Sequence, residues 1–314
     1  MDTEKRLPQT LMEAIRYFAD RDVAVEFVAK LRWPNGPVCP SCEGTEHSYL
    51  TTRRIWKCKS CKRQFSVKVG TIFEDSAIPL DKWLASIWLI ANSKNGISSH
   101  ELGRSIGLTQ KSAWFVLHRV RLAMQTGTFE QLSGEVEVDE TFVGGKAKFM
   151  HRDERARKIS GTGGSTANKT AVMGLLERDG EVRAMVVPNT KRATLDPQVR
   201  KHVEPGSAVF SDAAYGYSQL GDEYDHDFVD HAVRYVNGRV HTNGIENFWS
   251  LLKRGLKGTY VSVEPFHLFR YVDEQVFRFN ARKNNDLGRF VTVAARVSGR
   301  RLTYDQLTGR GLAG

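Results

Sequence analysis

Apolar and acidic residues alternate along residues 134–145, which read GEVEVDETFVGG. Valines occupy alternate positions at the start of this stretch, and Glu135, Glu137 and Asp139 lie between or beside them. This period of two predicts a half-buried strand with these acids on one face, whereas Glu140 points to the other. Because a row of like charges repels itself, the acidic face is expected to meet a cation or a set of donor groups.

The second half of the chain continues as alternating strand and helix patterns. Residues 170–188 contain two apolar runs joined by Asp179-Gly180, a dipeptide typical of a hairpin turn. The later predicted elements are a helix near Leu195 to Val203, a strand ending at Asp212, a strand near Val233 to Val236, a helix with Glu246 in its first turn and a helix within residues 264–284. This order of elements is typical of a ribonuclease H-like domain.

Helical periodicity dominates the chain before residue 134. Residues 10–31 predict two short helices with an acidic break between them, and residues 80–94 predict an amphipathic helix. Trp83 and Trp88 within that helix are expected to belong to the core. From residue 134 onward the composition changes to that of strands.

Residues 96–124 predict two helices joined by a tight turn. The positions concerned are Ser98 or Ser99 and Ile106 at the ends of the first helix, Gly107 in the turn and Thr109 at the start of the second helix. This pattern is typical of a helix-turn-helix, whose second helix would present Gln110 and Lys111 to the major groove of DNA. A plain helical hairpin is the alternative interpretation.

All four cysteines lie in one segment, as two CxxC pairs separated by fifteen residues. They are Cys39, Cys42, Cys58 and Cys61. This spacing is typical of a zinc ribbon, in which four thiolates hold one Zn²⁺ in a tetrahedron. Such a closed site stabilises a small domain and performs no chemistry. Two redox pairs or two disulfides are the alternative, which a reducing compartment disfavours.

Basic residues surround the cysteines and recur in a later segment. Those near the cysteines include Arg53, Arg54, Lys59, Lys62 and Arg63. With Trp56 and Phe65 they could form a surface that lies on a phosphate backbone, or simply a solvated face. Residues 144–170 lack periodicity and contain Lys146 and Lys148, which indicates a long basic loop that orders on nucleic acid. An idle insertion would have the same composition.

The overall charge favours a polyanionic partner. The 314 residues include 46 Lys and Arg against 36 Asp and Glu, a net charge of +10. Nucleic acid is the expected partner, and an ordinary basic soluble protein is the alternative. No apolar run approaches the roughly 18 residues that a membrane span needs, and the N-terminus lacks a signal-peptide pattern. We therefore expect a cytoplasmic protein.

Three acids on different predicted elements form a candidate metal site. Asp139 lies within a strand, Asp212 follows an apolar run, and Glu246 lies in the first turn of a helix. Hard oxygen ligands without clustered His or Cys suit Mg²⁺ or Mn²⁺ better than zinc. Glu246 could instead cap its helix, and Asp212 could be a plain turn residue. Glu135 or Glu137 could be ligands in place of Asp139.

Several stretches of the sequence resemble the IS1595-type (ISXO2-like) transposases of prokaryotic insertion sequences. They are VEVDETFVGGK, FSDAAYGY, HTNGIENFWSLLKRGLKGTY and the opening of the cysteine segment, RWPNGPVCPSC. The resemblance spans roughly residues 10–285. It implies a DDE-type transposase with an N-terminal zinc ribbon, a helix-turn-helix that helps to bind the element ends, and a ribonuclease H-like catalytic domain.

The resemblance also implies roles for individual residues. Asp139 and Asp212 match the first two catalytic acids, Glu246 the third and Lys253 the basic residue that accompanies it. Some family members are described with Asn as the third residue, and Asn247 lies directly beside Glu246. We prefer Glu246 because it is charged and, seven residues before Lys253, shares its helix face. Two Mg²⁺ or Mn²⁺ ions per active site would then hold the attacking and leaving oxygens.

We therefore expect a multidomain α+β protein. The expected boundaries are residues 1–75 for N-terminal helices and zinc ribbon, 76–128 for the helix-turn-helix region, 129–290 for the catalytic domain and 291–314 for a tail. Its predicted function is to bind terminal inverted repeats and target DNA as a homo-oligomer, nucleoid-associated when bound, and to cut and join strands. The alternatives are an inactive transposase-derived DNA-binding protein, a ribonuclease H-like nuclease and a zinc-dependent interaction protein. His241 is expected to hydrogen-bond its loop, with an approach to the metals as the alternative. Phe248 and Trp249 are expected to belong to the core, with stacking on bases as the alternative.

Overall fold

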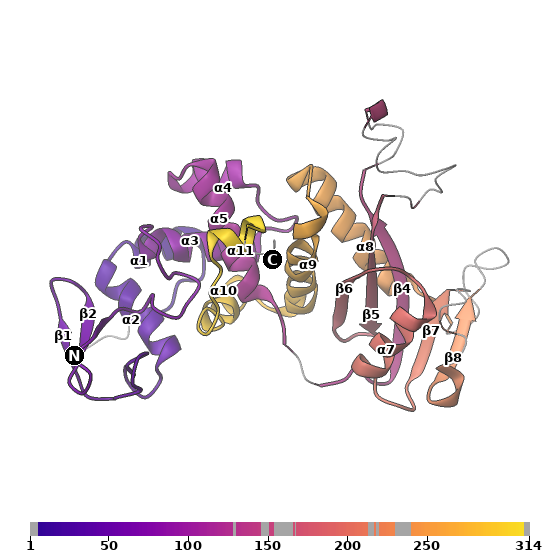
Figure 1. Cartoon of the computed structure of the whole chain (residues 1–314), viewed down its shortest axis with the longest axis horizontal. Helices are drawn as coiled ribbons and strands as arrows, with labels where there is room; N and C mark the ends of the chain where they lie inside the picture. Colours follow the sequence, from indigo (N-terminus) through magenta and orange to yellow (C-terminus); the bar gives the residue numbers. More distant parts are fainter. Residues whose placement is uncertain are drawn as a thin grey trace. The chain divides into compact units, whose positions relative to one another are not determined.

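The chain forms two compact units in a computed structural model (Figure 1). The residues that the structure describes are 6–127, 130–145, 151–153, 166, 168–212, 217, 220–229 and 240–310. The first unit comprises Met1–Gln125 and Ala281–Gly314, and the second comprises Thr126–Asn280. Within the described ranges, every helix is too short or too polar to cross a membrane.

The first unit combines a small sheet with seven helices within the described residues. The strands β1 (His47–Leu50), β2 (Ile55–Cys58) and β3 (Gln64–Phe65) form an antiparallel sheet in the order β1-β2-β3. The helices are α1 (Leu11–Phe18), α2 (Arg21–Arg32), α3 (Leu80–Asn92), α4 (Ser99–Ile106), α5 (Gln110–Met124), α10 (Asp286–Ala295) and α11 (Tyr304–Thr308). Trp83 and Trp88 of α3 are buried, as their spacing predicted.

The C-terminal residues of the chain complete the core of the first unit. Phe290 of α10 is fully buried and stacks on Phe27 of α2, with 5.6 Å between the ring centroids. The buried guanidinium of Arg119 in α5 donates to the carbonyls of Leu302 and Ile72, each at 2.9 Å. Residues that we expected to form a tail after position 290 therefore pack within this unit, because their apolar side chains fill its interior.

The two helices predicted in residues 96–124 are present, with caps that explain their ends. The hydroxyl of Ser98 accepts from the N–H of Glu101 and begins α4, and Gly107 ends it with a left-handed backbone of φ 65°. The hydroxyl of Thr109 then accepts from the N–H of Ser112 and begins α5. Each boundary follows from a local hydrogen bond, which is why the sequence pattern located it closely.

The second unit is built on a five-stranded mixed sheet. Its strands are β4 (Glu135–Val143), β5 (Thr170–Glu177), β6 (Val182–Val187), β7 (Ala208–Asp212) and β8 (Asp225–Val229), in the spatial order β6-β5-β4-β7-β8. β4, β5 and β6 are antiparallel neighbours, whereas β4, β7 and β8 run parallel. The helices are α7 (Arg192–His202), α8 (Asn243–Gly255) and α9 (Leu268–Asn280), and a π-helical turn, Leu256–Tyr260, follows α8.

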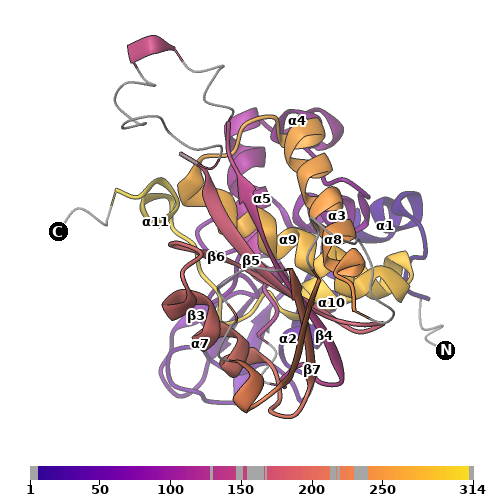
Figure 2. The same ribbon diagram turned by 90° about the vertical axis from the view of Figure 1, so that its right-hand side faces the viewer.

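Helices cover both faces of this sheet. Val136 and Val138 of β4 belong to a buried cluster that includes Leu195 of α7. On the opposite face, Val172 and Leu176 of β5 belong to a second cluster with residues of α8 and α9. Figure 1 shows α7 on one side of the strands and α8 and α9 on the other, and Figure 2 presents the sheet from the side that carries β7.

The hairpin predicted at Asp179 is confirmed, because β5 and β6 pair in antiparallel register on either side of it. The predicted helix near Leu195 is α7. The strand predicted near Val233 to Val236 lies outside the described residues, and β8 at Asp225–Val229 is the strand that pairs with β7. Lys146 and Lys148 also lie outside the described residues.

Candidate functional site

Asp139 and Asp212 lie at corresponding positions of neighbouring parallel strands. β4 and β7 pair up to Val138 and Ser211, and the next residue along each strand is one of the two acids. Burial, followed by the negative charge of Asp212, raises the pKa of Asp139 to about 7, and Glu246 acts in the same direction. Two acids 73 residues apart in the sequence therefore form one electrostatically coupled pair.

Both carboxylate oxygens of Asp139 accept a hydrogen bond from the protein. The backbone N–H of Glu140 donates to Oδ1 at 2.7 Å, and the indole Nε1–H of Trp249 donates to Oδ2 at 2.9 Å. Gly174 lies opposite Asp139 on β5, and a Cβ at Gly174 would meet the Trp249 ring at 2.6 Å. The missing side chain lets the indole reach Asp139, whose oxygens keep further lone pairs for a cation.

Asp212 carries a buried oxygen that has no hydrogen-bond partner in the described structure. This oxygen is Oδ1, and it is inaccessible to solvent. A buried polar atom without a partner costs about 1–3 kcal/mol, so such atoms are uncommon in folded proteins. A divalent cation would satisfy it, since carboxylate oxygens are the preferred ligands of Mg²⁺ and Mn²⁺.

The first turns of α8 carry the third acid of the candidate site. At 100° per residue, Glu246 lies roughly 60° around the helix from Trp249, and Lys253 lies close to the direction of Glu246. Because Trp249 contacts Asp139, this side of α8 faces the acidic end of β4. Asn247 lies roughly 160° from Trp249, and both Glu246 and Asn247 are exposed. The helix geometry therefore favours Glu246 over Asn247 as the residue next to Asp139.

Glu140 belongs to the same electrostatic cluster, although the strand pattern directs it to the opposite face. Burial, with smaller effects from the charges of Asp139 and Asp212, raises the pKa of Glu140 to about 8. The hydroxyl of Tyr217 donates a hydrogen bond to Glu140. Glu140 was left out of the candidate site in the sequence analysis because it points to the other face of the strand. Its position directly after Asp139 was the one sequence feature that could have included it.

Glu135 and Glu137, the alternative ligands in the sequence analysis, are engaged in ion pairs. Arg178 approaches Glu135 at 2.5 Å and Glu137 at 3.0 Å. His241 Nδ1 lies 3.2 Å from the carboxylate of Glu137, and the carbonyl of His241 accepts from Arg178 at 2.9 Å. These two acids therefore have a cationic partner of the protein's own, whereas Asp139 and Asp212 repel one another.

The three acids do not converge as closely as the cysteines. Within the described residues, the four cysteines are the one set of three or more His, Cys, Asp or Glu whose donor atoms all lie within 4.8 Å of one another. Asp139, Asp212 and Glu246 interact electrostatically, but their oxygens do not all lie that close together.

The cysteines meet in a geometry that fits tetrahedral zinc. The sulfurs of Cys39 and Cys61 lie 3.7 Å apart and those of Cys42 and Cys58 lie 3.6 Å apart. Zn–S bonds of about 2.3 Å in a tetrahedron give sulfur separations of roughly 3.8 Å. A disulfide would need about 2.05 Å. A backbone hydrogen bond from Cys61 is the largest effect on Cys58 and lowers its thiol pKa to about 6. The pKa of the neighbouring Cys42 is raised to about 12, because the lowering effect of the Gly44 backbone is outweighed by side-chain hydrogen bonds with Cys61 and Cys58.

Known protein families match both regions. The ISXO2-like transposase domain matches residues 131–280, and the transposase zinc-ribbon domain matches residues 20–64. An uncharacterized protein in transposable element ISH50 of Halobacterium salinarum is 30% identical over 259 residues, which are 78% of this chain and 86% of the relative. The chain belongs to the ISXO2-like transposase family.

A shorter relative supports the same family. An uncharacterized transposase-like protein of Haemophilus influenzae is 35% identical over 101 residues, which are 32% of this chain and 81% of that protein. The range matched by the transposase domain contains Asp139, Asp212, Glu246 and Lys253, and the range matched by the zinc ribbon contains all four cysteines. The family match and the close grouping of the four thiols therefore both support a zinc ribbon in this transposase-family chain.

The basic residues of the transposase ribbon differ in how accessible they are. Lys59, Lys62 and Arg63 are exposed, as is Arg53. Arg54 instead donates to both carboxylate oxygens of Asp22, at 2.7 and 3.0 Å, so much of its charge is already balanced. The expected aromatic part of this surface is corrected by the structure. Trp56 and Phe65 are 7% and 3% exposed and form the ribbon's core, because the small sheet has few other apolar side chains.

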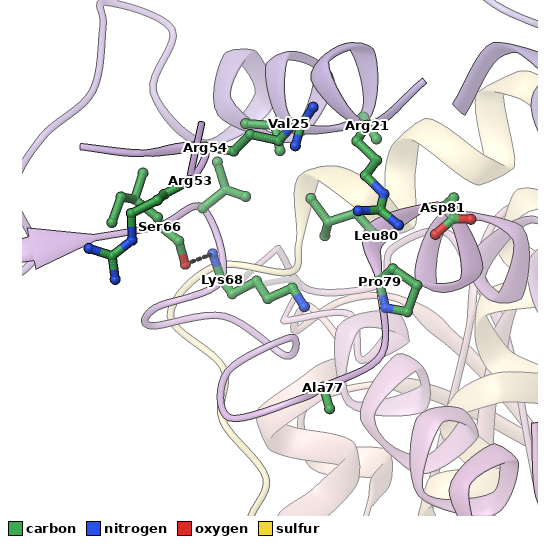
Figure 3. Close-up of a pocket in the computed structure, with 13 residues that line it drawn as sticks. Arg21, Val25, Arg53, Arg54, Ser66, Lys68, Ala77, Pro79, Leu80 and Asp81 are labelled. Carbon is green, nitrogen blue, oxygen red and sulfur yellow. Dashed lines mark hydrogen bonds between the residues drawn. The ribbon is translucent and has the colours of Figure 1, made fainter. Parts of the chain in front are cut away.

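A basic pocket of about 570 Å³ lies beside the transposase ribbon, between α2 and the start of α3 (Figure 3). Arg21, Arg53, Arg54 and Lys68 supply its cations. The ammonium of Lys68 donates to the carbonyls of Ser76 and Ile78, at 3.0 and 2.7 Å, and its role is therefore structural. Of the pocket's cations, Arg53 and Arg54 belong to the expected DNA-contacting set.

The start of α5 presents the two other side chains expected to contact DNA. Gln110 and Lys111 are both exposed. The amide of Gln110 donates to the hydroxyl of Ser99 at 2.9 Å, and the Lys111 ammonium lies 5.1 Å from the centre of the Tyr304 ring. These contacts orient the two side chains at the N-terminal end of the helix, the end that enters the groove in helix-turn-helix proteins.

Proposed function

We propose that this chain is an insertion-sequence transposase that binds the ends of its element and catalyses metal-dependent DNA cleavage and strand transfer. Membership of the ISXO2-like family supports the reaction class. The spatial strand order β6-β5-β4-β7-β8 supports a ribonuclease H-like catalytic domain. The single observation that carries the proposal is the coupled pair Asp139 and Asp212, with the buried unpartnered oxygen of Asp212 beside it.

The proposed roles follow from the place of each side chain. Asp139, which is held by Trp249, would hold two Mg²⁺ or Mn²⁺ ions together with Asp212 and Glu246. When bound, such ions lower the pKa of water and neutralise charge on a phosphate. Lys253, two helical turns after Glu246, is placed to offset the charge of a non-bridging phosphate oxygen.

The proposed reaction has two displacements at phosphorus. In the first, water attacks at the element end, the bond from phosphorus to the 3′ oxygen breaks, and a 3′ hydroxyl leaves. In the second, this hydroxyl attacks a phosphodiester of the target, so that the element is joined and the target strand leaves with its own 3′ hydroxyl. The acids would fix the geometry of both steps, which are in-line substitutions with the same charge distribution.

DNA binding is assigned to the first unit and to the segment that follows β4 in the second unit. The proposed contacts are Arg53, Arg54, Lys59, Lys62 and Arg63 on the ribbon, Gln110 and Lys111 on α5, and Lys146 and Lys148 in the segment after β4. The net charge of +10 supports long-range attraction to DNA. The capped pair α4 and α5 supports a helix-turn-helix, with the start of α5 in a major groove. Joining two element ends requires at least two protomers, so we propose a homo-oligomer on DNA.

The test is a strand-transfer assay with the full chain and Mg²⁺. The substrate is duplex DNA taken from the two flanks of the coding sequence in its genome, which would contain the terminal repeats. We expect Asp139→Ala, Asp212→Ala and Glu246→Ala to lower cleavage and joining at least a hundredfold, and Asn247→Ala to stay within a few-fold of wild type. If Asn247→Ala loses as much activity as Asp139→Ala and Glu246→Ala loses none, Asn247 and not Glu246 is the third catalytic residue.

The same assay separates the alternative functions. Cleavage without any joined product would identify a nuclease. Binding to the flanking DNA with no cleavage by the wild-type chain would identify a DNA-binding protein that has lost its activity. If the wild-type chain retains zinc but neither binds nor cleaves this DNA, the remaining alternative is a zinc-dependent interaction protein.

A further inference from the structure

A buried carboxylate outside the proposed ligand set links β4 to the start of α8. Glu137 is 1% exposed and lies two residues before Asp139. Its Oε2 accepts a hydrogen bond from the backbone N–H of Ile245 at 2.9 Å. The residue after Ile245 is Glu246, the proposed third acid. One side chain therefore joins the strand of the first acid to the helical turn of the third.

We propose that Glu137 is a positioning residue, which fixes the first turn of α8 against β4 and thereby sets Glu246 relative to Asp139. This inference rests on the proposed function, in which these two acids hold ions of the same site. Glu137 itself touches neither DNA nor ion in this assignment. Its role is to hold the separation between two ligands that come from different elements.

The hydrogen bond to Ile245 replaces a cap that α8 lacks. Thr242 is the residue before α8 and makes no side-chain capping bond to it. The first N–H groups of a helix need acceptors, and a negative charge there also interacts favourably with the helix dipole. The carboxylate of Glu137 supplies both effects from a neighbouring strand. As a result, the position of α8 depends on β4 rather than on its own preceding residue.

Gly244 makes this close approach possible. A Cβ at Gly244 would lie 2.9 Å from Oε2 of Glu137 and 2.6 Å from a methyl carbon of Leu176. Real side chains do not approach that closely, so a larger residue at 244 would push the start of α8 away from the sheet. The fit of the helix against β4 and β5 therefore requires a glycine at this place.

Arg178 completes the link and balances the buried charge. Its Nε donates to Oε1 of Glu137 at 3.0 Å, and its Nη2 donates to the carbonyl of His241 at 2.9 Å, in the segment before α8. The guanidinium also lies 4.5 Å from the centre of the Phe210 ring of β7. A buried carboxylate paired in this way is costly to leave without its partner. The Arg178–Glu137 ion pair therefore fixes the segment before α8 at a second point, the carbonyl of His241.

The first measurement is hydrogen exchange of the full-length protein without DNA or divalent ions. We expect Glu137→Ala to increase amide exchange at least tenfold in the peptide that covers Ile245, with little change in β6 or α7. Glu137→Gln keeps an acceptor for the Ile245 N–H and is expected to show a smaller increase. The matched control is Glu135→Gln, which also removes a carboxylate from Arg178 and lies two residues before Glu137 on β4.

The second measurement is the Mn²⁺ concentration that gives half-maximal cleavage of the flanking DNA. We expect Glu137→Ala to raise it at least tenfold, Glu137→Gln about threefold, and Glu135→Gln less than twofold. A variant that merely folds less well would lower the active fraction and leave this concentration unchanged. Mn²⁺ binding without DNA, followed by electron paramagnetic resonance, is expected to weaken in the same order.

The outcomes separate this proposal from the proposed function. Unchanged exchange at the start of α8 in both Glu137 variants, or faster exchange with unchanged Mn²⁺ dependence, would overturn the positioning role. If the wild-type chain neither cleaves DNA nor binds Mn²⁺, the proposed function fails, and the exchange data alone report whether Glu137 caps α8. If Glu137→Ala does not fold, Glu137→Gln and the control decide the question.

Discussion

The indole of Trp249 donates its Nε1–H to Oδ2 of Asp139 at 2.9 Å, from one helical turn beyond Glu246. The ring is 4% exposed and lies in the space left by Gly174. Trp249 was expected to be a core residue, and it is one. It also has a polar contact, because a buried indole needs an acceptor for its N–H.

Trp249→Phe is expected to keep most of the packing and to remove this hydrogen bond. Asp139 then loses one donor that restrains its carboxylate, and we expect strand cleavage in Mg²⁺ to fall about tenfold to a hundredfold. The melting temperature should fall by several degrees, since a hydrogen bond to a charged acceptor contributes about 1.5–3 kcal/mol. Phe248→Leu is the control on the same helix, expected to reduce stability without a comparable loss of the cleavage rate per folded molecule.

Gly174→Ala tests the space that the indole occupies. The new methyl would lie 2.6 Å from the Trp249 ring and 2.7 Å from a methyl carbon of Ile245. Overpacking of this kind costs about 1–3 kcal/mol, and we expect urea unfolding to report a loss in that range. An unchanged midpoint would mean that α8 adjusts freely to the added methyl.

Without divalent ions, the stability of the second unit is expected to depend on the charge of Asp139. Its pKa is about 7 in the folded chain and near 3.8 when unfolded. Between these values the folded state binds more protons than the unfolded state, so its stability falls as the pH rises through this window. At about 1.4 kcal/mol per pKa unit, Asp139→Asn is therefore expected to raise the free energy of unfolding at pH 8 by up to about 4 kcal/mol.

At pH 4 the same substitution should have little effect, because the carboxyl is then largely protonated in the folded chain. Thermal melts of the zinc-loaded chain without added divalent ions, at both pH values, measure the difference. If Asp139→Asn destabilises the chain equally at both pH values, the ionised carboxylate of Asp139 does not reduce the stability of the folded state. Adding Mg²⁺ is expected to stabilise wild type more than Asp139→Asn, since ion binding favours the folded state.

One zinc ion per chain is expected by atomic absorption, bound by the four cysteines. Cys58→Ser should reduce zinc content to well under half and weaken binding to the flanking DNA, because a ribbon of this size folds around its metal. Because all four thiols bind the zinc ion, Cys42→Ser should reduce zinc content and DNA binding in the same way as Cys58→Ser. Full zinc content in either variant would contradict the tetrahedral assignment.

Lys62→Ala tests whether the ribbon contacts phosphates. Each lost phosphate contact should reduce the slope of log affinity against log salt by about 1, and we expect that change for Lys62. Lys30→Ala is the matched control, because the Lys30 ammonium pairs with Glu26 at 2.9 Å on α2. Equal slopes for both variants, measured by fluorescence anisotropy between low and physiological salt, would remove Lys62 from the interface.

Local chemistry was sufficient to predict many elements of this protein. The period of two at residues 134–145 predicted β4, the hydroxyls of Ser98 and Thr109 predicted the starts of α4 and α5, and Asp179 predicted a hairpin. The cysteine spacing predicted a cluster that the structure brings together. Each of these follows from residues a few positions apart, whose hydrogen bonds or ligand spacing act within one element or one small domain.

The relations between distant segments were decided by the tertiary structure alone. Parallel pairing of β4 with β7 brings Asp139 beside Asp212, and it leaves Glu137 to cap α8 although its place on the strand made it an equal candidate for a ligand. The packing of α10 likewise returns the end of the chain to the first unit. The alternation of a strand specifies which face a side chain occupies, whereas its partner depends on which helix or strand the fold places there.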